Sequence, residues 1–245
     1  MSNLGDRMKL YEEPTRLRLQ IKTPVVIRVD GRSFHTYTRG AQKPYDVLIQ
    51  KAMQAATLAL CNKAMGAVVG FQQSDEITVI CQDWQNYESE QWFGGNVQKI
   101  ATAAVVIATN AFNSYPGVIE AFGQASFDGR VHNIPHHEIV NHLIWRQQDT
   151  LRNSVSSLAQ YYFSHSDLQG KSCDEMKAML LEKVDVDWVT VLPSFVRNGF
   201  VVSKQYVQFE GAGPLEHGLP AWTPDFNVPL FNENREYATR LFPEV

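Results

Sequence analysis

Two acidic residues, Asp30 and Asp75, lie in sequence contexts that indicate a catalytic or metal-binding role. Asp30 follows the apolar run 24–29 and precedes Gly31, and Asp75 lies beside Glu76 between two short apolar runs. An acid at the end of an otherwise apolar strand is costly when buried unpaired, so it must be solvated, paired or bound to a cation. Two carboxylates beside a glycine carbonyl are hard oxygen donors suited to two Mg²⁺ ions that bridge a nucleoside triphosphate, and they indicate nucleotidyl transfer. Each acid taken alone also has a purely structural interpretation: Asp30 could begin an Asp-Gly turn, and Asp75 could cap a turn.

Elements predicted from the periodicity explain how acids 45 residues apart (75 − 30) can meet. In chain order they are a strand (24–30), a helix (46–65) capped by Asp46, a hairpin (67–71 and 77–81), a helix (98–112) and a strand (125–134). This βαββαβ order is typical of a ferredoxin-like sheet, with two helices on one face and the other face open. The first and third strands are central neighbours in such a sheet, which brings Asp30 toward Asp75. The predicted fold class is therefore α+β.

The rest of the chain is predicted to be a helical extension followed by a tail. Helices are expected over 138–149, 153–163 and 173–183, within an extension spanning about 136–185 that packs against or beside the sheet. The segment 211–245 is rich in Gly and Pro at its start and is expected to be irregular. Residues 1–210 are therefore assigned to one catalytic domain and 211–245 to a C-terminal tail.

Composition excludes several classes of protein. With 245 residues, 44% of them hydrophobic and 20% charged, the chain is typical of a folded globular protein and not of a disordered or fibrous one. No apolar run approaches the ~20 residues of a membrane span, the N-terminal residues lack an apolar signal stretch, and the three cysteines have no CxxC spacing, so we expect a cytoplasmic protein without a membrane partner. The net charge is −4, yet residues 1–40 carry eight Lys/Arg against four acids, which favours a local phosphate-facing surface.

Five short motifs occur in an order that resembles a known family. They are Ile27–His35 (IRVDGRSFH), Lys43–Asp46 (KPYD), Gln73–Glu76 (QSDE), Phe127–Val131 (FDGRV) and Trp145–Asp149 (WRQQD). Together they resemble the tRNA-His guanylyltransferase superfamily over roughly the first 200 residues. The resemblance implies a palm-type nucleotidyltransferase that adds nucleotides to the 5′ end of tRNA in the 3′-5′ direction, with two Mg²⁺ ions and with ATP or GTP as activating and incoming nucleotides.

The resemblance also assigns roles to individual residues. It implies that Asp30, the Gly31 carbonyl and Asp75 bind metal, and that Asp30, Asp75 and Glu76 are the catalytic acids. The residues that it places around the nucleotide and its triphosphate are Arg28, Gly31, Arg32, Ser33, Phe34, His35, Lys43, Asp46, Ser74, Lys99 and Asn153. The family is usually tetrameric, so a homotetramer is expected, with the aromatic cluster around Trp84 and Trp92 interpreted as a subunit contact in preference to a base-stacking platform. The expected RNA partner is the 5′ end and acceptor stem of tRNA.

At two places the sequence differs from the pattern of the family. Residues 151–154 read Leu-Arg-Asn-Ser where the tRNA-His enzymes carry His-Ile-Asn-Asn, and this form looks more like the Thg-like branch of 3′-5′ RNA polymerases, which repair 5′-truncated tRNA. Residues 94–96 read Gly-Gly-Asn in front of Lys99, where eukaryotic members have adjacent arginines. Two alternative functions stay open at this point, a palm-type nucleotide cyclase and a non-catalytic RNA-binding module.

Overall fold

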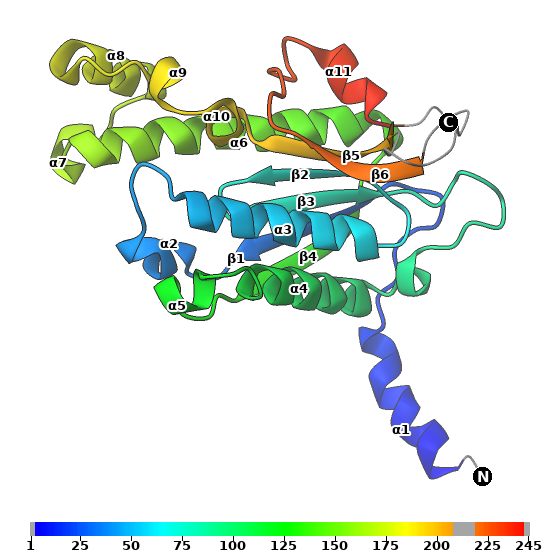
Figure 1. The fold of residues 1–245 in the computed structure, drawn as a ribbon. Coiled ribbons are helices and arrows are strands. Elements are labelled where there is room, and N and C mark those ends of the chain that lie inside the picture. The colour runs from blue at the N-terminus through cyan, green and yellow to red at the C-terminus, as the bar shows by residue number, and fades with distance from the viewer. Residues whose placement is uncertain (1–2, 208–218, 243–245) are drawn as a thin grey trace.

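A single antiparallel sheet organises the chain. The computed structural model describes residues 3–207 and 219–242, and its six strands lie in the order β4-β1-β3-β2-β5-β6 (Figure 1). The strands are β1 (Val25–Gly31), β2 (Ala67–Gln73), β3 (Glu76–Cys81), β4 (Phe127–Asn133), β5 (Phe200–Val207) and β6 (Leu219–Asp225). β1 lies between β3 and β4, as the βαββαβ order predicted, and Asp30 is in register with Glu76 on one side and Asp128 on the other.

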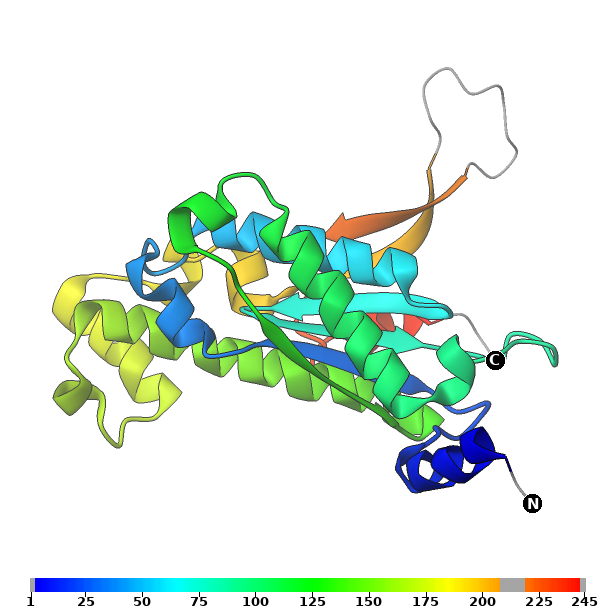
Figure 2. The ribbon, with the colours of Figure 1, turned by 90° about the horizontal axis from the view of Figure 1, so that it is seen from below.

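Two long helices cover the first face of the sheet, as predicted. α3 (Val47–Lys63) and α4 (Val97–Asn113) pack on the strand residues that alternate toward them, such as Val29 and Val79 (Figure 2). Asp46 caps α3, accepting hydrogen bonds from the backbone N–H of Leu48 at 2.9 Å and of Ile49 at 3.2 Å. This cap fixes where the helix begins and thus how the preceding loop enters it.

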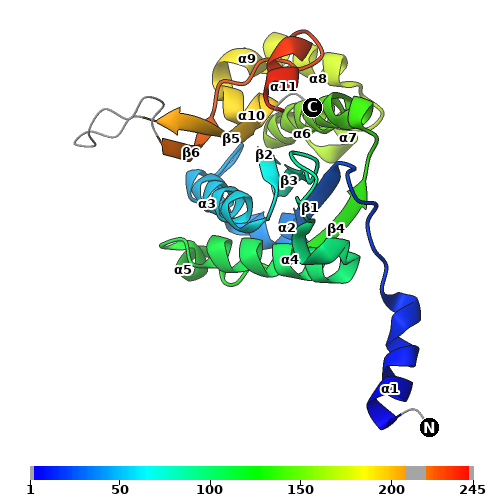
Figure 3. The ribbon, with the colours of Figure 1, turned by 90° about the vertical axis from the view of Figure 1, so that its right-hand side faces the viewer.

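The second face is not open, which corrects the expectation from the sequence. A single helix, α6 (Ile139–Tyr162), runs across it where two helices, 138–149 and 153–163, were predicted (Figure 3). The predicted break is wrong because the intervening residues Thr150–Arg152 include neither Gly nor Pro, so nothing local ends the helix. The first half of α6 buries Ile139 and Leu143 against Val26 and Ile80 of the sheet.

The helical extension is built on the second half of α6. α7 (His165–Leu168), α8 (Cys173–Val184), α9 (Trp188–Val191) and α10 (Ser194–Asn198) follow it in the chain. Leu158 of α6 and Leu180 of α8 are fully buried in a third apolar cluster, separate from the two clusters on the faces of the sheet. The extension is therefore anchored to the same helix that covers the second face.

The segment 211–245 carries regular structure where the model describes it, which corrects the expected irregular tail; its residues 211–218 and 243–245 lie outside the described residues. β6 pairs with β5 along its whole length, and α11 (Arg235–Arg240) and Phe231 pack on the second face. Pro220 and Pro224 suggested an irregular chain, but β6 is an edge strand, where missing N–H donors are tolerated.

The remaining elements lie at the margins. They are α1 (Leu4–Glu12), η1 (Glu13–Thr15), α2 (Phe34–Tyr37), η2 (Thr38–Gly40), η3 (Trp92–Gly95), α5 (Val118–Phe122) and η4 (His136–Glu138). α1 extends away from the rest of the protein and buries none of its residues (Figures 1 and 3). Among the described helices, none combines the length and apolar character required to cross a membrane.

Candidate active site

Asp30 and Asp75 come together at one end of the central strands. Asp30 is near the end of β1, and Asp75 lies in the β2-β3 turn, whose backbone carbonyl accepts a hydrogen bond from Gly31 N–H at 3.2 Å. The Asp75 carboxylate lies against the same glycine, because a Cβ placed on Gly31 would be 3.0 Å from Asp75 Oδ2. The predicted approach of the two acids is therefore seen in the structure.

The surroundings of the two carboxylates disfavour their charged forms. Burial, followed by the nearby charge of Asp30, raises the pKa of Asp75 to about 6. Burial, followed by the charge of Asp128, also raises the pKa of Asp30, while the nearby Arg28 and Arg130 oppose that rise. Neither Asp30 nor Asp75 forms an ion pair with a Lys, Arg or His among residues 3–207 and 219–242. Within these residues no basic side chain therefore neutralises either acid by direct contact.

This donor set fits a divalent cation. Mg²⁺ binds through one or two carboxylates and keeps other positions for water and substrate phosphate, so two acids beside a glycine carbonyl are sufficient. In the described part of the chain no group of three or more His, Cys, Asp or Glu side chains comes together as a closed metal cage. The residues that would hold the ions are Asp30, Asp75 and the carbonyl of Gly31.

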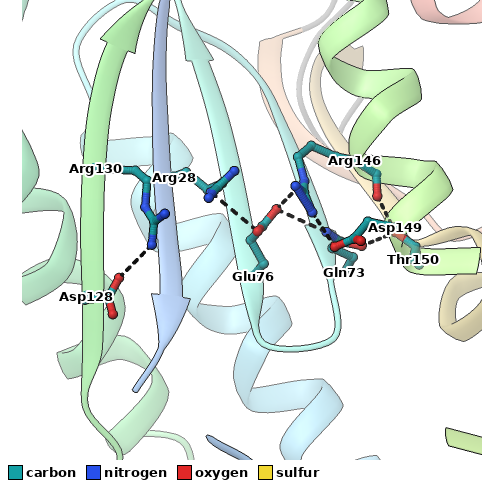
Figure 4. A network of polar contacts seen from close by, with 8 residues as sticks. All are labelled: Arg28, Gln73, Glu76, Asp128, Arg130, Arg146, Asp149 and Thr150. Atoms are coloured by element: carbon teal, nitrogen blue, oxygen red, sulfur yellow. Dashed lines mark hydrogen bonds and ion pairs between the residues drawn. The ribbon is translucent and has the colours of Figure 1, made fainter. Parts of the chain in front are cut away.

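Glu76 has a different environment from the other two acids. Its carboxylate lies 2.9 Å from Arg146 Nε and 3.5 Å from Arg28 Nε, and it accepts a hydrogen bond from Gln73 at 3.1 Å (Figure 4). Burial raises the pKa of Glu76 while the neighbouring Arg146 opposes that rise. Glu76, the residue after Asp75, therefore ties the β2-β3 turn to α6. This is a positioning role beside the catalytic role predicted for it.

A network of polar contacts extends from this ion pair along α6. Arg146 also pairs with Asp149, and Thr150 donates a hydrogen bond to the Gln73 side chain (Figure 4). Asp149 pairs in turn with Arg152. The side chains of Glu76 and Arg146 are only 11% and 6% exposed, so water screens their attraction weakly. The network fixes the β2-β3 turn, and with it Asp75, relative to the helix.

A cavity of about 380 Å³ adjoins Asp75. This volume is within the range of small-molecule sites. The predicted nucleotide-binding residues that line the cavity are Phe34, His35, Lys43, Asp46, Ser74 and Asn153. Lys43 is the one Lys or Arg among the described residues of its lining, and its exposed ammonium is suited to follow a phosphate.

Two of these residues also have clear structural tasks. Asp46 caps α3 and accepts a further hydrogen bond from Gln42 N–H at 3.0 Å, so it fixes the loop that carries Lys43. Phe34 is buried and packs edge-on against Phe112, with ring centroids 5.7 Å apart. Both would be needed for the shape of the cavity even without touching a ligand.

Sequence reasoning missed most of the wall that α6 contributes. Polar residues on one stripe of the helix line the cavity, and only Asn153 was predicted; the others are Thr150, Ser154, Ser157 and Gln160. Their spacing of three and four residues was the available signal, since it places polar groups on one face of a helix. The incorrect break between 149 and 153 concealed it.

Several predicted residues lie away from the cavity. Lys99 is in the first turn of α4, next to Ile100, which lines a small cavity with Val25 at the opposite end of β1 from Asp30. Within one chain, Lys99 is therefore not brought to the acids. Arg28 is turned toward Glu76 on the α6 face, while Arg32 and Ser33 are exposed after β1 and do not line the cavity. The individual roles assigned to these residues by resemblance stay predictions.

Comparison with known proteins identifies the family. The family model described as tRNAHis guanylyltransferase, Thg1, matches residues 5–135. The chain belongs to this family. It is similar to the probable tRNA(His) guanylyltransferase of Dictyostelium discoideum, with 28% identity over 218 residues, covering 82% of this chain and 82% of that protein.

Solved structures of this family support the fold along nearly the whole chain. A bacterial Thg1-like protein in complex with ATP has a TM-score of 0.86 and 32% identity, covering 98% of this chain and 99% of that one. The same type of protein in complex with GTP has a TM-score of 0.83 and 32% identity with the same coverage. The palm-like α+β fold predicted from the motifs is thus confirmed, and this member of the Thg1 family is a nucleotidyltransferase.

Proposed function

We propose that this protein adds nucleotides to the 5′ end of tRNA in the 3′-5′ direction, using the opposite strand of the acceptor stem as template. The observation that carries the proposal is the pair of adjacent acids, Asp30 and Asp75, of which Asp75 lines a cavity of about 380 Å³, in a chain of the Thg1 family. The departure from the tRNA-His pattern at residues 151–154 favours repair of 5′-truncated tRNA over a reaction restricted to tRNA-His.

The cavity is proposed to hold the nucleoside triphosphate. The related bacterial proteins are described in complex with ATP and with GTP, and both nucleotides are the ones expected here. Lys43 and Ser74 lie with Asp75 in the lining, so the triphosphate would be bound with its reacting phosphate toward Asp75. The amide and hydroxyl groups of α6 offer both donors and acceptors, which suits the acceptance of either purine.

The chemistry proposed needs no protein nucleophile. Two Mg²⁺ ions, when bound, would neutralise charge on the transferring phosphate and lower the pKa of the attacking hydroxyl. Asp30, Gly31 and Asp75 would hold the ions, and Glu76 with its buried arginines would keep the β2-β3 turn in place. The first step joins the RNA 5′-phosphate to the α-phosphate of the triphosphate with loss of pyrophosphate. The second joins the 3′-hydroxyl of the incoming nucleotide to the RNA 5′-phosphate of that activated end, with loss of the nucleoside monophosphate.

Assembly and location complete the proposal. A homotetramer and a cytoplasmic location are expected by analogy with the family. α1 and the chain that follows it expose Leu4, Met8, Leu10, Tyr11 and Leu17, each more than 45% accessible, which supports a contact with another subunit.

The test is an extension reaction with a defined RNA. The purified protein is incubated with Mg²⁺, nucleoside triphosphates and a 5′-monophosphorylated tRNA that lacks its first nucleotide, and the 5′ end is resolved at single-nucleotide level. Template-matched extension that is lost in Asp30→Ala and in Asp75→Ala is the expected result, with Glu182→Gln, at an exposed acid of α8, as the control. A cyclic nucleotide formed from triphosphate alone would instead assign the protein to the cyclases.

A further inference from the structure

A second exposed surface adjoins the catalytic acids, on the side away from the cavity. Its exposed members are Asp128 and Arg130 of β4 and Trp145 of α6. Arg28 of β1, whose side chain is only 14% exposed, contacts the Trp145 ring, and we refer to these four residues as the β4 strip. Arg28 and Arg130 are in register on the paired strands. The side chains of Arg130 and Asp128 are 53% and 54% exposed, so this edge of the sheet is accessible, and the two pair with each other (Figure 4).

Trp145 is the unusual member of the β4 strip. It is 48% exposed, although a large aromatic ring gains stability from burial. Three neighbours hold the ring: the guanidinium of Arg146 lies 4.1 Å from its centroid, that of Arg28 lies 5.6 Å away, and the His142 ring contacts it edge-on at 5.4 Å. The ring is therefore held in one orientation while much of its surface faces solvent. The Trp145 side chain would lose little conformational entropy when a ligand stacks on it.

An exposed aromatic ring close to an exposed guanidinium group is chemistry that recognises the end of a nucleic acid strand. Bases stack on such a ring regardless of their identity, and the exposed guanidinium of Arg130 can attract a phosphate. Arg28 and Asp30 are two residues apart on the same face of β1, a distance of about 7 Å along the strand. A nucleotide stacked on Trp145 would therefore have its phosphate close to the acids.

The arrangement of the two surfaces gives each substrate its own route. The cavity reaches the acids through Ser74 and Asp75, whereas the β4 strip reaches them through Asp30. We propose that Trp145 stacks the terminal base of the RNA 5′ end and that the β4 strip guides this end to the acids. The proposal rests on the proposed function, because it names where the RNA enters the same site.

The experiment measures RNA binding apart from catalysis. The probe is a 5′-monophosphorylated tRNA lacking its first nucleotide, with 2-aminopurine as its 5′-terminal base, whose fluorescence falls when the base stacks. The variants are Trp145→Ala, Trp145→Phe and, as matched control, Tyr161→Ala, since Tyr161 is also on α6 and 54% exposed. ATP affinity is measured separately for each variant.

Stacking on an aromatic ring is worth ~1–3 kcal/mol per base, so Trp145→Ala is expected to raise the Kd for RNA by about 5- to 150-fold. Trp145→Phe should recover most of the affinity, Tyr161→Ala should stay within about twofold of the wild type, and ATP affinity should be unchanged in all variants. A Kd for RNA within about twofold of wild type in Trp145→Ala, or an equal loss in Trp145→Phe, would overturn the proposal.

The wild-type protein alone supplies a second test that no folding defect can obscure. Its binding should lower the fluorescence of 2-aminopurine at the 5′ terminus and leave unchanged the fluorescence of the same base placed three nucleotides further along the stem. An unquenched terminal base overturns the role of Trp145. RNA binding that depends on Trp145 in a protein without extension activity would support the β4 strip and refute the proposed function, and extension that is insensitive to Trp145→Ala would do the reverse.

Discussion

Replacement of Asp75 by Asn is expected to make the metal-free protein more stable while it abolishes activity. Asp75 is mostly buried, and its pKa rises from 3.8 to about 6 through burial and the charge of Asp30. A shift of about 2 pKa units corresponds to ~3 kcal/mol, since each unit is worth ~1.4 kcal/mol. Partial access of water to the turn lowers the expected gain for Asp75→Asn to about 1–3 kcal/mol at pH 7.5.

The pH dependence has a definite sign. The native state keeps a proton on Asp75 between about pH 4 and pH 6, where the unfolded state has lost it, so stability falls as pH rises through this window. The advantage of Asp75→Asn should therefore vanish near pH 4 and reach its full size above pH 6.

Urea unfolding in EDTA, followed at several pH values, measures this difference. Glu182→Gln, at an exposed acid of α8, serves as control and should change the free energy of unfolding by less than about 0.5 kcal/mol. Mg²⁺ with ATP should then raise the melting temperature of the wild type and not that of Asp75→Asn. A variant that is less stable than the wild type at pH 7.5, or a gain that does not change between pH 4 and pH 7, would refute the reasoning.

Three further changes test the surroundings of the acids. Glu76→Gln removes the anion from two buried ion pairs and should lower the free energy of unfolding by about 3 kcal/mol in urea titrations; a loss below about 1 kcal/mol would show that the pairs are not buried as described. Gly31→Ala brings a Cβ within 2.3 Å of the Phe34 ring and should cost about 1–3 kcal/mol, whereas Gly40→Ala, with nothing within 4 Å, should be nearly neutral in the same thermal melts. Burial lowers the pKa of His142 to about 4, so stability should rise with pH between about 4 and 6.5, and His142→Gln should show a smaller difference in melting temperature between pH 5 and pH 7.

The central sheet and the pair of acids could be predicted from sequence because their signals are local. The apolar, β-branched runs 24–30 and 77–81 define two strands, and the chain order then places them side by side, which brings Asp30 to Asp75. The strand β6 was missed because Pro220 and Pro224 disfavour a strand in general, and no local signal shows that this strand lies at an edge. The distance of Lys99 from Asp75 within one chain could not be predicted, because it depends on which end of α4 lies near the acids, and the helical period does not reveal this.

The roles of α6 explain why the second half of the sequence was the harder half to interpret. Its 24 residues, about 36 Å of helix, serve three environments in succession. The first half covers the sheet through Leu143 and exposes Trp145, the middle binds Glu76 through Arg146, and the second half lines the cavity and supports α8. Because one rigid helix carries all three, a rotation that improved its packing on the sheet would move the cavity wall and the β4 strip together. The orientation of α6 must therefore satisfy the polar stripe and the buried Arg146 at the same time. The sequence of α6 is thus determined by the need to position Asp75 as well as by its packing against the sheet.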